Sequence, residues 1–362
     1  MNIYDLWFSS VSLSSKIKLD LIKKFISTEE LWNDTFYNAN KTLLNDRDKK
    51  IKYNLKKAWD KELLESLIVK IKNKNIEATT FNEDIYPKAL KNYDDSPSIL
   101  FYKGDINKLN MGINAAIIGS RNFTSYGKDA ARLISKEISI NNINVISGMA
   151  RGIDTFAHES SIENGGFTCA VLGSGIDVVY PGENKKLYDI ISEKGCIVSE
   201  FLPGTRPFSY NFPIRNRIIS GLSDIVIVVE ASEKSGSLVT AGIALEQGKE
   251  IVAVPGSMFS EQSKGTNKLI RDGAYPFTDF EDLFRILNID YMIKNNIKVN
   301  KIEGVKKKIC DILGDRPTHI DDIFGRTNID IKQLYELLFE LQLENVVICL
   351  SGNYYVKVES TV

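Results

Sequence analysis

Short apolar runs rich in β-branched residues alternate with stretches of helical period through the middle of this 362-residue chain. Their apolar residues are continuous rather than alternating, which indicates strands buried on both faces. Strands and helices that follow one another in this way build a parallel, doubly wound sheet. The expected strands are Ala115–Ile118, Val145–Ser147, Thr168–Leu172, Cys196–Ser199, Ile225–Val229 and Ile251–Val254. The expected helices between them are Lys128–Ile140, Asp154–Glu163, Leu187–Glu193 and Leu238–Gln247.

Two segments of different character flank this sheet, which we assign to residues 76–290. Residues 1–75 contain no glycine and have helical spacing of apolar residues, so we expect a helical domain of SAM or helix-hairpin-helix type. Their 15 basic and 10 acidic residues fit a solvated surface, and a weak contribution to nucleic-acid affinity stays open. Residues 300–362 contain three helical stretches and then a hairpin around Ser351-Gly352-Asn353, the order of a winged-helix domain.

Composition excludes several classes of protein. The chain cannot coat nucleic acid through bulk charge, because its 46 Lys and Arg residues are balanced by 47 Asp and Glu. Four distant cysteines without a CxxC pair and only two histidines argue against a zinc site or a redox dithiol. We therefore expect no metal or cofactor. A signal-peptide pattern and a long apolar span are both missing, so we expect a cytoplasmic protein without membrane insertion.

The ends of the expected strands carry residues that suit an anion. Parallel sheets bind ligands beyond the carboxyl ends of their strands. Gly119, Ser120 and Arg121 follow the first strand and precede a helix, so free backbone N–H groups, a positive helix end and a guanidinium should meet there. The glycines do not have GxGxxG spacing, which disfavours a nicotinamide dinucleotide.

The next two strands end in similar turns. Gly148 and Arg151 follow the second strand, and Asp154 is expected to cap the helix after them. Gly173 and Ser174 follow the third strand. Each turn alone is also compatible with an ordinary connection between a strand and a helix, so only their recurrence at one sheet edge predicts a binding site.

A further turn follows the strand Ile225–Val229 and opens another helix. Its loop offers hydroxyls and backbone N–H groups to an anion, although the spacing of a P-loop is absent. The candidate binding residues in this turn are Lys234, Ser235, Gly236, Ser237 and Thr240.

Aromatic and arginine residues interleave over Phe208–Arg217. This composition is typical of a groove for single-stranded nucleic acid, in which rings stack on bases and guanidinium groups bind phosphates. Phe212, Asn216 and Arg217 are the candidate binding residues here, and packing of the rings onto the core is the alternative. Paired carboxylates, a metal cluster and a Ser-His-Asp order are not apparent, so we predict a binding protein and no catalytic residues.

At these motifs the chain resembles the family of DNA-processing protein A, the DprA/Smf family. The entry segment Tyr86–Gly104 is similar as well, and the resemblance covers about 200 residues. The motifs that carry it are, in order, Gly119–Arg121, Ser147–Asp154, Gly173–Gly175, Asn216–Ser223, Ser235–Ala241 and Val254–Gly256.

The resemblance implies an extended Rossmann-like domain that binds single-stranded DNA in a basic pocket. It implies a homodimeric recombination mediator that protects incoming strands during natural transformation and loads the RecA recombinase onto them. The family's pocket residues carry over to Arg121, Arg217 and Lys234, together with Ser235 and Gly236, and to Phe212 as a further match. RecA and a second copy of the chain are thus the implied protein partners.

The C-terminal segment departs from a duplex-binding winged helix. Residues 300–362 contain 8 basic and 10 acidic residues, and the expected recognition helix carries Asp330, Glu336 and Glu340 against Lys332. Phosphates in a major groove would repel such a helix. We therefore expect a protein-interaction role for this domain, rather than that of a winged-helix transcription factor.

An enzymatic alternative is a nucleotide phosphoribohydrolase resembling the lysine-decarboxylase-like (LOG) group, which shares this type of sheet. The PGGxGTxxE pattern of that group places a carboxylate three residues after its threonine. Here Ile243 stands three residues after Thr240, and its apolar side chain cannot take part in acid–base chemistry.

Overall fold

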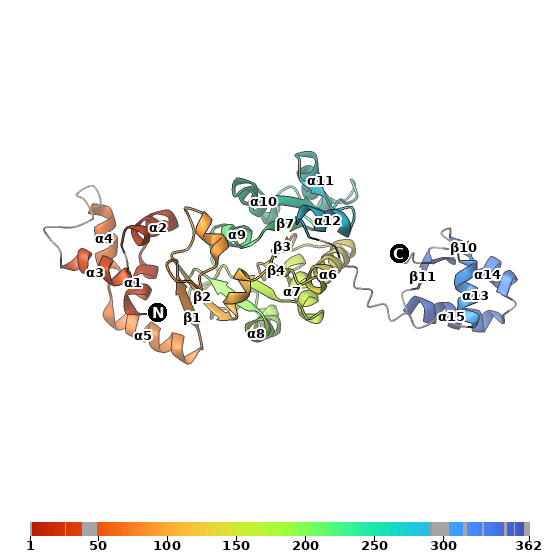
Figure 1. The fold of residues 1–362 in the computed structure, drawn as a ribbon, viewed down its shortest axis with the longest axis horizontal. Helices are drawn as coiled ribbons and strands as arrows, with labels where there is room; N and C mark the ends of the chain where they lie inside the picture. The colour runs from red at the N-terminus through yellow and green to blue at the C-terminus, as the bar shows by residue number, and fades with distance from the viewer. Residues whose placement is uncertain are drawn as a thin grey trace. The chain divides into compact units, whose positions relative to one another are not determined.

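The computed structural model divides into two compact units, Met1–Met292 and Ile293–Val362. The first contains the N-terminal helices and a large sheet, and the second contains a smaller helical and β-stranded domain (Figure 1). None of the helices in the described residues combines the length and the apolar composition needed to cross a bilayer. The structure describes residues 2–25, 27–37, 49–289, 291, 304–313, 317–327, 329–343, 346–350 and 352–357.

The centre of the first unit is a nine-stranded sheet formed within residues 77–276. Its order is β1-β2-β6-β5-β4-β3-β7-β8-β9, and β2 pairs antiparallel with both β1 and β6 while the remaining pairs are parallel. The order reverses between β3 and β7, which creates a topological switch point. The strands are β1 Glu77–Thr80, β2 Ile99–Gly104, β3 Asn114–Ile118, β4 Asn144–Ser147, β5 Thr168–Val171, β6 Cys196–Ser199, β7 Ile225–Val228, β8 Glu250–Ala253 and β9 Tyr275–Pro276.

Helices lie on both sides of the sheet, as Figure 1 shows. Ala115 and Ile117 of β3 belong to an apolar cluster with α6 and α7, whereas Ala116 and Ile118 belong to a cluster with α9 and α10. Successive side chains of a strand point to opposite faces, so the continuous apolar runs follow from burial on both sides. The helices are α6 Ser125–Ile140, α7 Ile153–Glu163, α8 Lys185–Lys194, α9 Asn211–Leu222, α10 Gly236–Glu246, α11 Lys264–Arg271 and α12 Phe280–Ile286. Short 3₁₀ turns are η2 Lys88–Asn92, η3 Ile106–Asn110, η4 Gly182–Asn184 and η5 Glu261–Ser263.

The N-terminal helices pack around aromatic side chains. The ring centroids of Trp32 and Trp59 lie 4.9 Å apart, and the indole N–H of Trp7 donates to the carbonyl oxygen of Leu55 at 2.9 Å. Their apolar core continues into the sheet, because one cluster of buried residues joins these helices to strands β5 and β6. The boundary expected near residue 75 stays a prediction. The helices are α1 Ile3–Ser10, α2 Ser15–Lys24, α3 Thr28–Phe36, α4 Lys49–Lys57 and α5 Lys61–Asn73.

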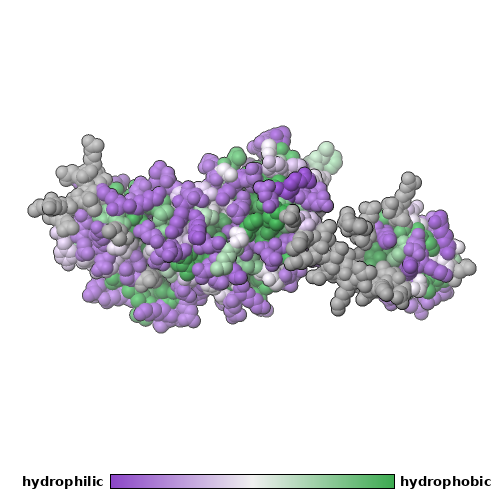
Figure 2. Space-filling view, viewed as in Figure 1, coloured by the Kyte–Doolittle hydropathy of each residue, from purple (hydrophilic) through white to green (hydrophobic). Residues whose placement is uncertain are grey.

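The second unit has the winged-helix order in its described residues. Its sheet has the order β10-β12-β11 with antiparallel pairs, and α13, α14 and α15 pack beside it. On the face of the protein drawn in Figure 2, polar residues cover much of the described surface, with smaller apolar areas among them. The elements are α13 Val305–Ile312, β10 Thr318–His319, α14 Ile320–Thr327, α15 Ile331–Leu343, β11 Val347–Leu350 and β12 Tyr354–Lys357. The predicted class, a Rossmann-like parallel sheet with an N-terminal helical part and a C-terminal winged helix, is confirmed.

A buried carboxylate fixes the start of α6, and with it the turn that follows β3. Glu230, 2% exposed, accepts hydrogen bonds from the backbone N–H of Thr124 at 2.9 Å and from its hydroxyl at 2.5 Å. The Thr124 hydroxyl oxygen in turn accepts from the backbone N–H of Gly127 at 3.1 Å and caps the helix. The loop after β7 and the helix after β3 are therefore tied together.

Replacing Thr124 by Val should destabilise the first unit. The variant loses the helix cap and leaves one oxygen of Glu230 without a partner, so the free energy of unfolding should fall by roughly 2–4 kcal/mol. Urea unfolding followed by circular dichroism measures this. Thr124→Ser keeps the hydroxyl and is the control; an equal loss in both variants would contradict the assigned role.

Candidate nucleic-acid interface

A cavity of about 560 Å³ opens at the switch point, where the chain leaves β3 and β7. We call it the switch-point cavity. It is lined by the turn after β3, the loop before α10 and the first two turns of α9, together with Ala150 and Asp154. The predicted site residues that line it are Gly119, Ser120, Arg121, Phe212, Asn216, Ser235, Gly236, Ser237 and Thr240.

The turn after β3 is packed more tightly than an open anion cradle. A Cβ atom on Gly119 would lie 2.7 Å from the Ile153 side chain, so only glycine fits there. The Ser120 hydroxyl lies 2.7 Å from both Gln262 Oε1 and the carbonyl oxygen of Asn122. The carboxylate of Glu230 already occupies the N-terminus of α6. The expectation that this helix end faces a ligand is therefore wrong, because a protein carboxylate neutralises it.

The N-terminus of α10 is the open helix end in the switch-point cavity. Its first turn contains no acidic residue, and Ser235 caps it by accepting from the backbone N–H of Ser237 at 3.4 Å. The hydroxyls of Ser235 and Ser237 lie 2.7 Å apart, and a Cβ on Gly236 would meet open space. Backbone N–H groups, hydroxyls and the positive end of the helix dipole thus converge on the cavity. Lys234 is exposed in the preceding turn and does not line the cavity.

The ring of Phe212 contacts the two arginines of the switch-point cavity, Arg121 and Arg215. The guanidinium carbons of Arg121 and Arg215 lie 5.4 Å and 5.8 Å from the centroid of its ring, within the range of cation–π attraction. The ring also packs against Tyr180 at 5.6 Å, and a Cβ on Gly173 would lie 2.7 Å from it. These contacts engage the ring within the protein, so Phe212 positions Arg121 rather than offering an open stacking face.

Arg215 is a cavity residue that the sequence analysis missed. It is 4% exposed and donates to the carbonyl oxygens of Gly148, at 2.8 Å, and Val171, at the ends of β4 and β5. Burial lowers its pKa to about 10, an effect that the neighbouring Asp154 opposes. Alternation of arginine with aromatic residues marked this segment, but nothing in the pattern separated Arg215 from Arg217.

Asp154 has a different role from the expected helix cap. Gly152 precedes the first residue of α7, and the Asp154 carboxylate accepts from the backbone N–H groups of Gly148 and Ala150 at 3.1 Å and 3.3 Å. Burial raises its pKa, and Arg215 opposes that shift. A Cβ on Gly148 would lie 2.8 Å from both Arg215 and Asp154, so this glycine makes room for the pair.

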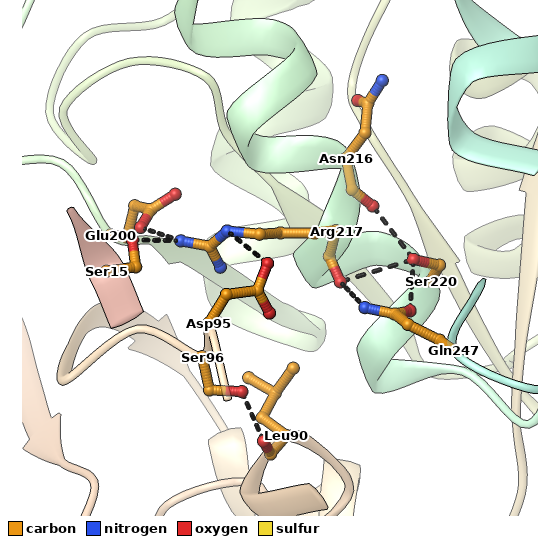
Figure 3. Close-up of polar contacts among 9 residues, drawn as sticks. All are labelled: Ser15, Leu90, Asp95, Ser96, Glu200, Asn216, Arg217, Ser220 and Gln247. Atoms are coloured by element: carbon orange, nitrogen blue, oxygen red, sulfur yellow. Dashed lines mark hydrogen bonds and ion pairs between the residues drawn. The ribbon is translucent and has the colours of Figure 1, made fainter. Parts of the chain in front are cut away.

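Arg217 lies outside the switch-point cavity. Its side chain points toward Glu200, Ser15 and Asp95, away from the direction of Asn216 (Figure 3). It forms an ion pair with Glu200, donates to the Ser15 hydroxyl at 2.9 Å and lies 3.7 Å from Asp95. Burial raises the pKa of Glu200, which Arg217 lowers again. The structure therefore does not bring Arg217 together with Arg121, contrary to expectation.

A second cavity, of about 600 Å³, receives Arg217. We call it the helical-segment cavity, because Ser9, Ser15 and Lys18 of the N-terminal helices line one side of it. The segments around Asp95 and Glu200 line it as well. Arg217 thus joins the N-terminal helices to the sheet.

The remaining predicted residues do not line the switch-point cavity. Arg151 forms a bidentate pair with Glu183, at 2.7 Å and 2.9 Å, on the surface. Ser174 is buried and donates to the carbonyl oxygen of Val178 at 2.8 Å. A small hollow that adjoins the cavity is lined by Gly148 and Arg151. These residues shape the turns at the edge of the site.

Two family models match the chain. The model of DNA recombination-mediator protein A covers residues 77–288, and the DprA winged helix domain covers residues 303–353. The former describes recombination mediators, so the match assigns no enzymatic activity to the chain and does not favour the phosphoribohydrolase alternative.

Individual proteins agree with these models. DNA processing protein DprA of Bacillus subtilis is 46% identical over 209 residues, 57% of this chain and 70% of that protein. Protein Smf of Escherichia coli is 33% identical over 306 residues, 82% of each.

Solved structures extend the comparison. DprA from Streptococcus pneumoniae superposes with a TM-score of 0.68 at 31% identity, covering 81% of this chain and 99% of that one. DprA from Helicobacter pylori, whose structure concerns its single-stranded DNA binding mode, gives a TM-score of 0.54 at 31% identity, covering 60% and 98%. The family model and these relatives show that the chain belongs to the DprA/Smf family of DNA-processing proteins.

Proposed function

We propose that this chain binds unpaired DNA in the switch-point cavity. In this proposal it protects incoming single strands during natural transformation and loads RecA onto them, as a homodimer in the cytoplasm. The observation that carries the binding proposal is the cavity itself, where the open N-terminus of α10 lies with Arg121 and buried Arg215. The family's recombination-mediator character and the subject of the Helicobacter pylori structure support it.

The electrostatics of the switch-point cavity favour a phosphate backbone. Arg121 and Arg215 contribute two positive charges, and the one carboxylate among the described lining residues, Asp154, is engaged by backbone N–H groups and lies beside Arg215. Helix N-termini and arginines are the groups that hold phosphates without reading sequence. Lys234, exposed in the turn before α10, adds a charge at the edge of this proposed path.

Single-stranded DNA suits the cavity of the first unit, and duplex DNA does not suit the second. The cavity has a volume of about 560 Å³, and an unpaired strand is flexible enough to bend into a cleft of that kind, whereas a double helix is rigid. In the winged helix, Asp330 before α15 and Glu336 and Glu340 within it are exposed, and although Glu340 pairs with Lys306, this acidic surface opposes contact with duplex phosphates. We propose that this domain binds protein partners instead.

Replacing Arg121 by Ala should weaken binding of a dT oligonucleotide and leave folding intact. The slope of log affinity against log salt should become shallower by about 0.7 for each phosphate that the variant no longer binds. Fluorescence anisotropy at several salt concentrations measures both. Arg285→Ala, which removes an exposed arginine of α12, is the control. Wild-type behaviour of the Arg121 variant, or equal affinity of the parent protein for duplex DNA, would contradict the proposal.

Replacing Arg217 by Ala should act on stability instead of on the salt slope. Removing the guanidinium leaves the largely buried carboxylate of Glu200 without its ion-pair partner and with only Lys18 as a nearby cation, which should cost roughly 2–4 kcal/mol of unfolding free energy. Adding Glu200→Gln removes the unpaired charge and should restore part of that loss in urea unfolding. A shallower salt slope with unchanged stability would instead return Arg217 to the DNA-binding site.

A further inference from the structure

Two exposed aromatic rings lie together in the segment that contributes Pro207 and Ser209 to the switch-point cavity. Phe208 and Tyr210 are stacked, with ring centroids 5.4 Å apart and planes only 7° from parallel. They are 45% and 63% exposed. Within the described part of the chain, neither ring has another aromatic or cationic partner. The pair therefore presents aromatic surface to solvent.

Hydrogen bonds hold the segment that carries these rings. The carbonyl oxygen of Arg206 accepts from the backbone N–H of Phe208 at 2.9 Å and from the side-chain amide of Asn211 at 3.3 Å. The backbone N–H of Asn211 donates to the carbonyl oxygen of Phe208 at 3.0 Å, and Asn211 is 2% exposed. The backbone that carries the rings is thus held in place by these bonds, which reduces the entropy cost of binding to this segment.

The position of the rings connects them to the cavity. Phe208 and Tyr210 do not line the switch-point cavity themselves, but their chain neighbours Pro207 and Ser209 do, so the pair lies within one residue of the cavity wall. Phe212, the third aromatic residue of the segment, is already engaged by two arginines, Tyr180 and Gly173. Phe208 and Tyr210 are therefore the rings of this segment with open surface next to the cavity.

We propose that the Phe208–Tyr210 pair is a stacking surface for a nucleobase of the strand whose phosphates enter the switch-point cavity. The inference rests on the proposed function and assigns it a source of selectivity. Phosphate contacts position a strand but carry no base information. Both faces of a base inside a duplex are covered by its neighbours, so only an unpaired strand offers a base to this pair.

The test uses two labelled oligonucleotides of equal length, dT and a fully abasic strand, in anisotropy titrations of the full chain. The double variant Phe208→Ala/Tyr210→Ala should bind dT roughly 5- to 150-fold more weakly, the range for loss of a stacking aromatic. Its affinity for the abasic strand should stay unchanged. Tyr210→Phe keeps the ring and should bind as the parent does. Tyr53→Ala removes a 63% exposed tyrosine from α4 and is the matched control.

The outcomes separate this inference from the proposed function. Undiminished dT binding by the double variant overturns the stacking assignment and leaves the cavity as the DNA site. An equal loss on dT and abasic strands also overturns it, because the rings would then act only through the shape of the loop. A parent protein that binds neither strand contradicts the proposed function itself.

Discussion

The buried guanidinium of Arg215 joins the parts of the molecule that make its candidate site. It reaches from α9 to the carbonyl ends of β4 and β5 and lies beside Asp154 of α7, so two strands and two helices meet at one side chain. A charged group taken out of water must have its donors satisfied, which restricts its geometry. The ring of Phe212 packs on this guanidinium and also contacts the guanidinium of Arg121. The exposed cation of the cavity is thus positioned by a buried one.

The two helices that begin at the switch point differ in what neutralises them. Glu230 occupies the N-terminus of α6, while α10 begins with serine hydroxyls and a glycine. A carboxylate beside one helix end leaves the other as the favourable place for an external anion. The positive potential that a helix end contributes to the cavity therefore comes from α10 and not from α6.

Much of the architecture is predictable from sequence because burial on both faces leaves a plain signature. The apolar runs located the six central strands, and glycine and serine at their ends located the edge where the switch-point cavity opens. The orientation of α9 was not predictable in the same way. Arg215 and Arg217 both lie on buried sides of that helix, and only the surrounding chain decides which one meets the cavity. The role of Glu230 was not predictable either, because it binds the start of a helix that lies 106 residues away in the sequence.

The placement of α9 between two cavities restricts how its sequence can change. Phe212, Pro213, Arg215, Asn216 and Ile219 line the switch-point cavity, while Ile214 and Arg217 line the helical-segment cavity. Ile218, which lines neither cavity, is fully buried in the apolar core. Every position from 212 to 219 is therefore either buried or part of a cavity wall. We expect few substitutions in this stretch of α9 to leave both cavities unchanged.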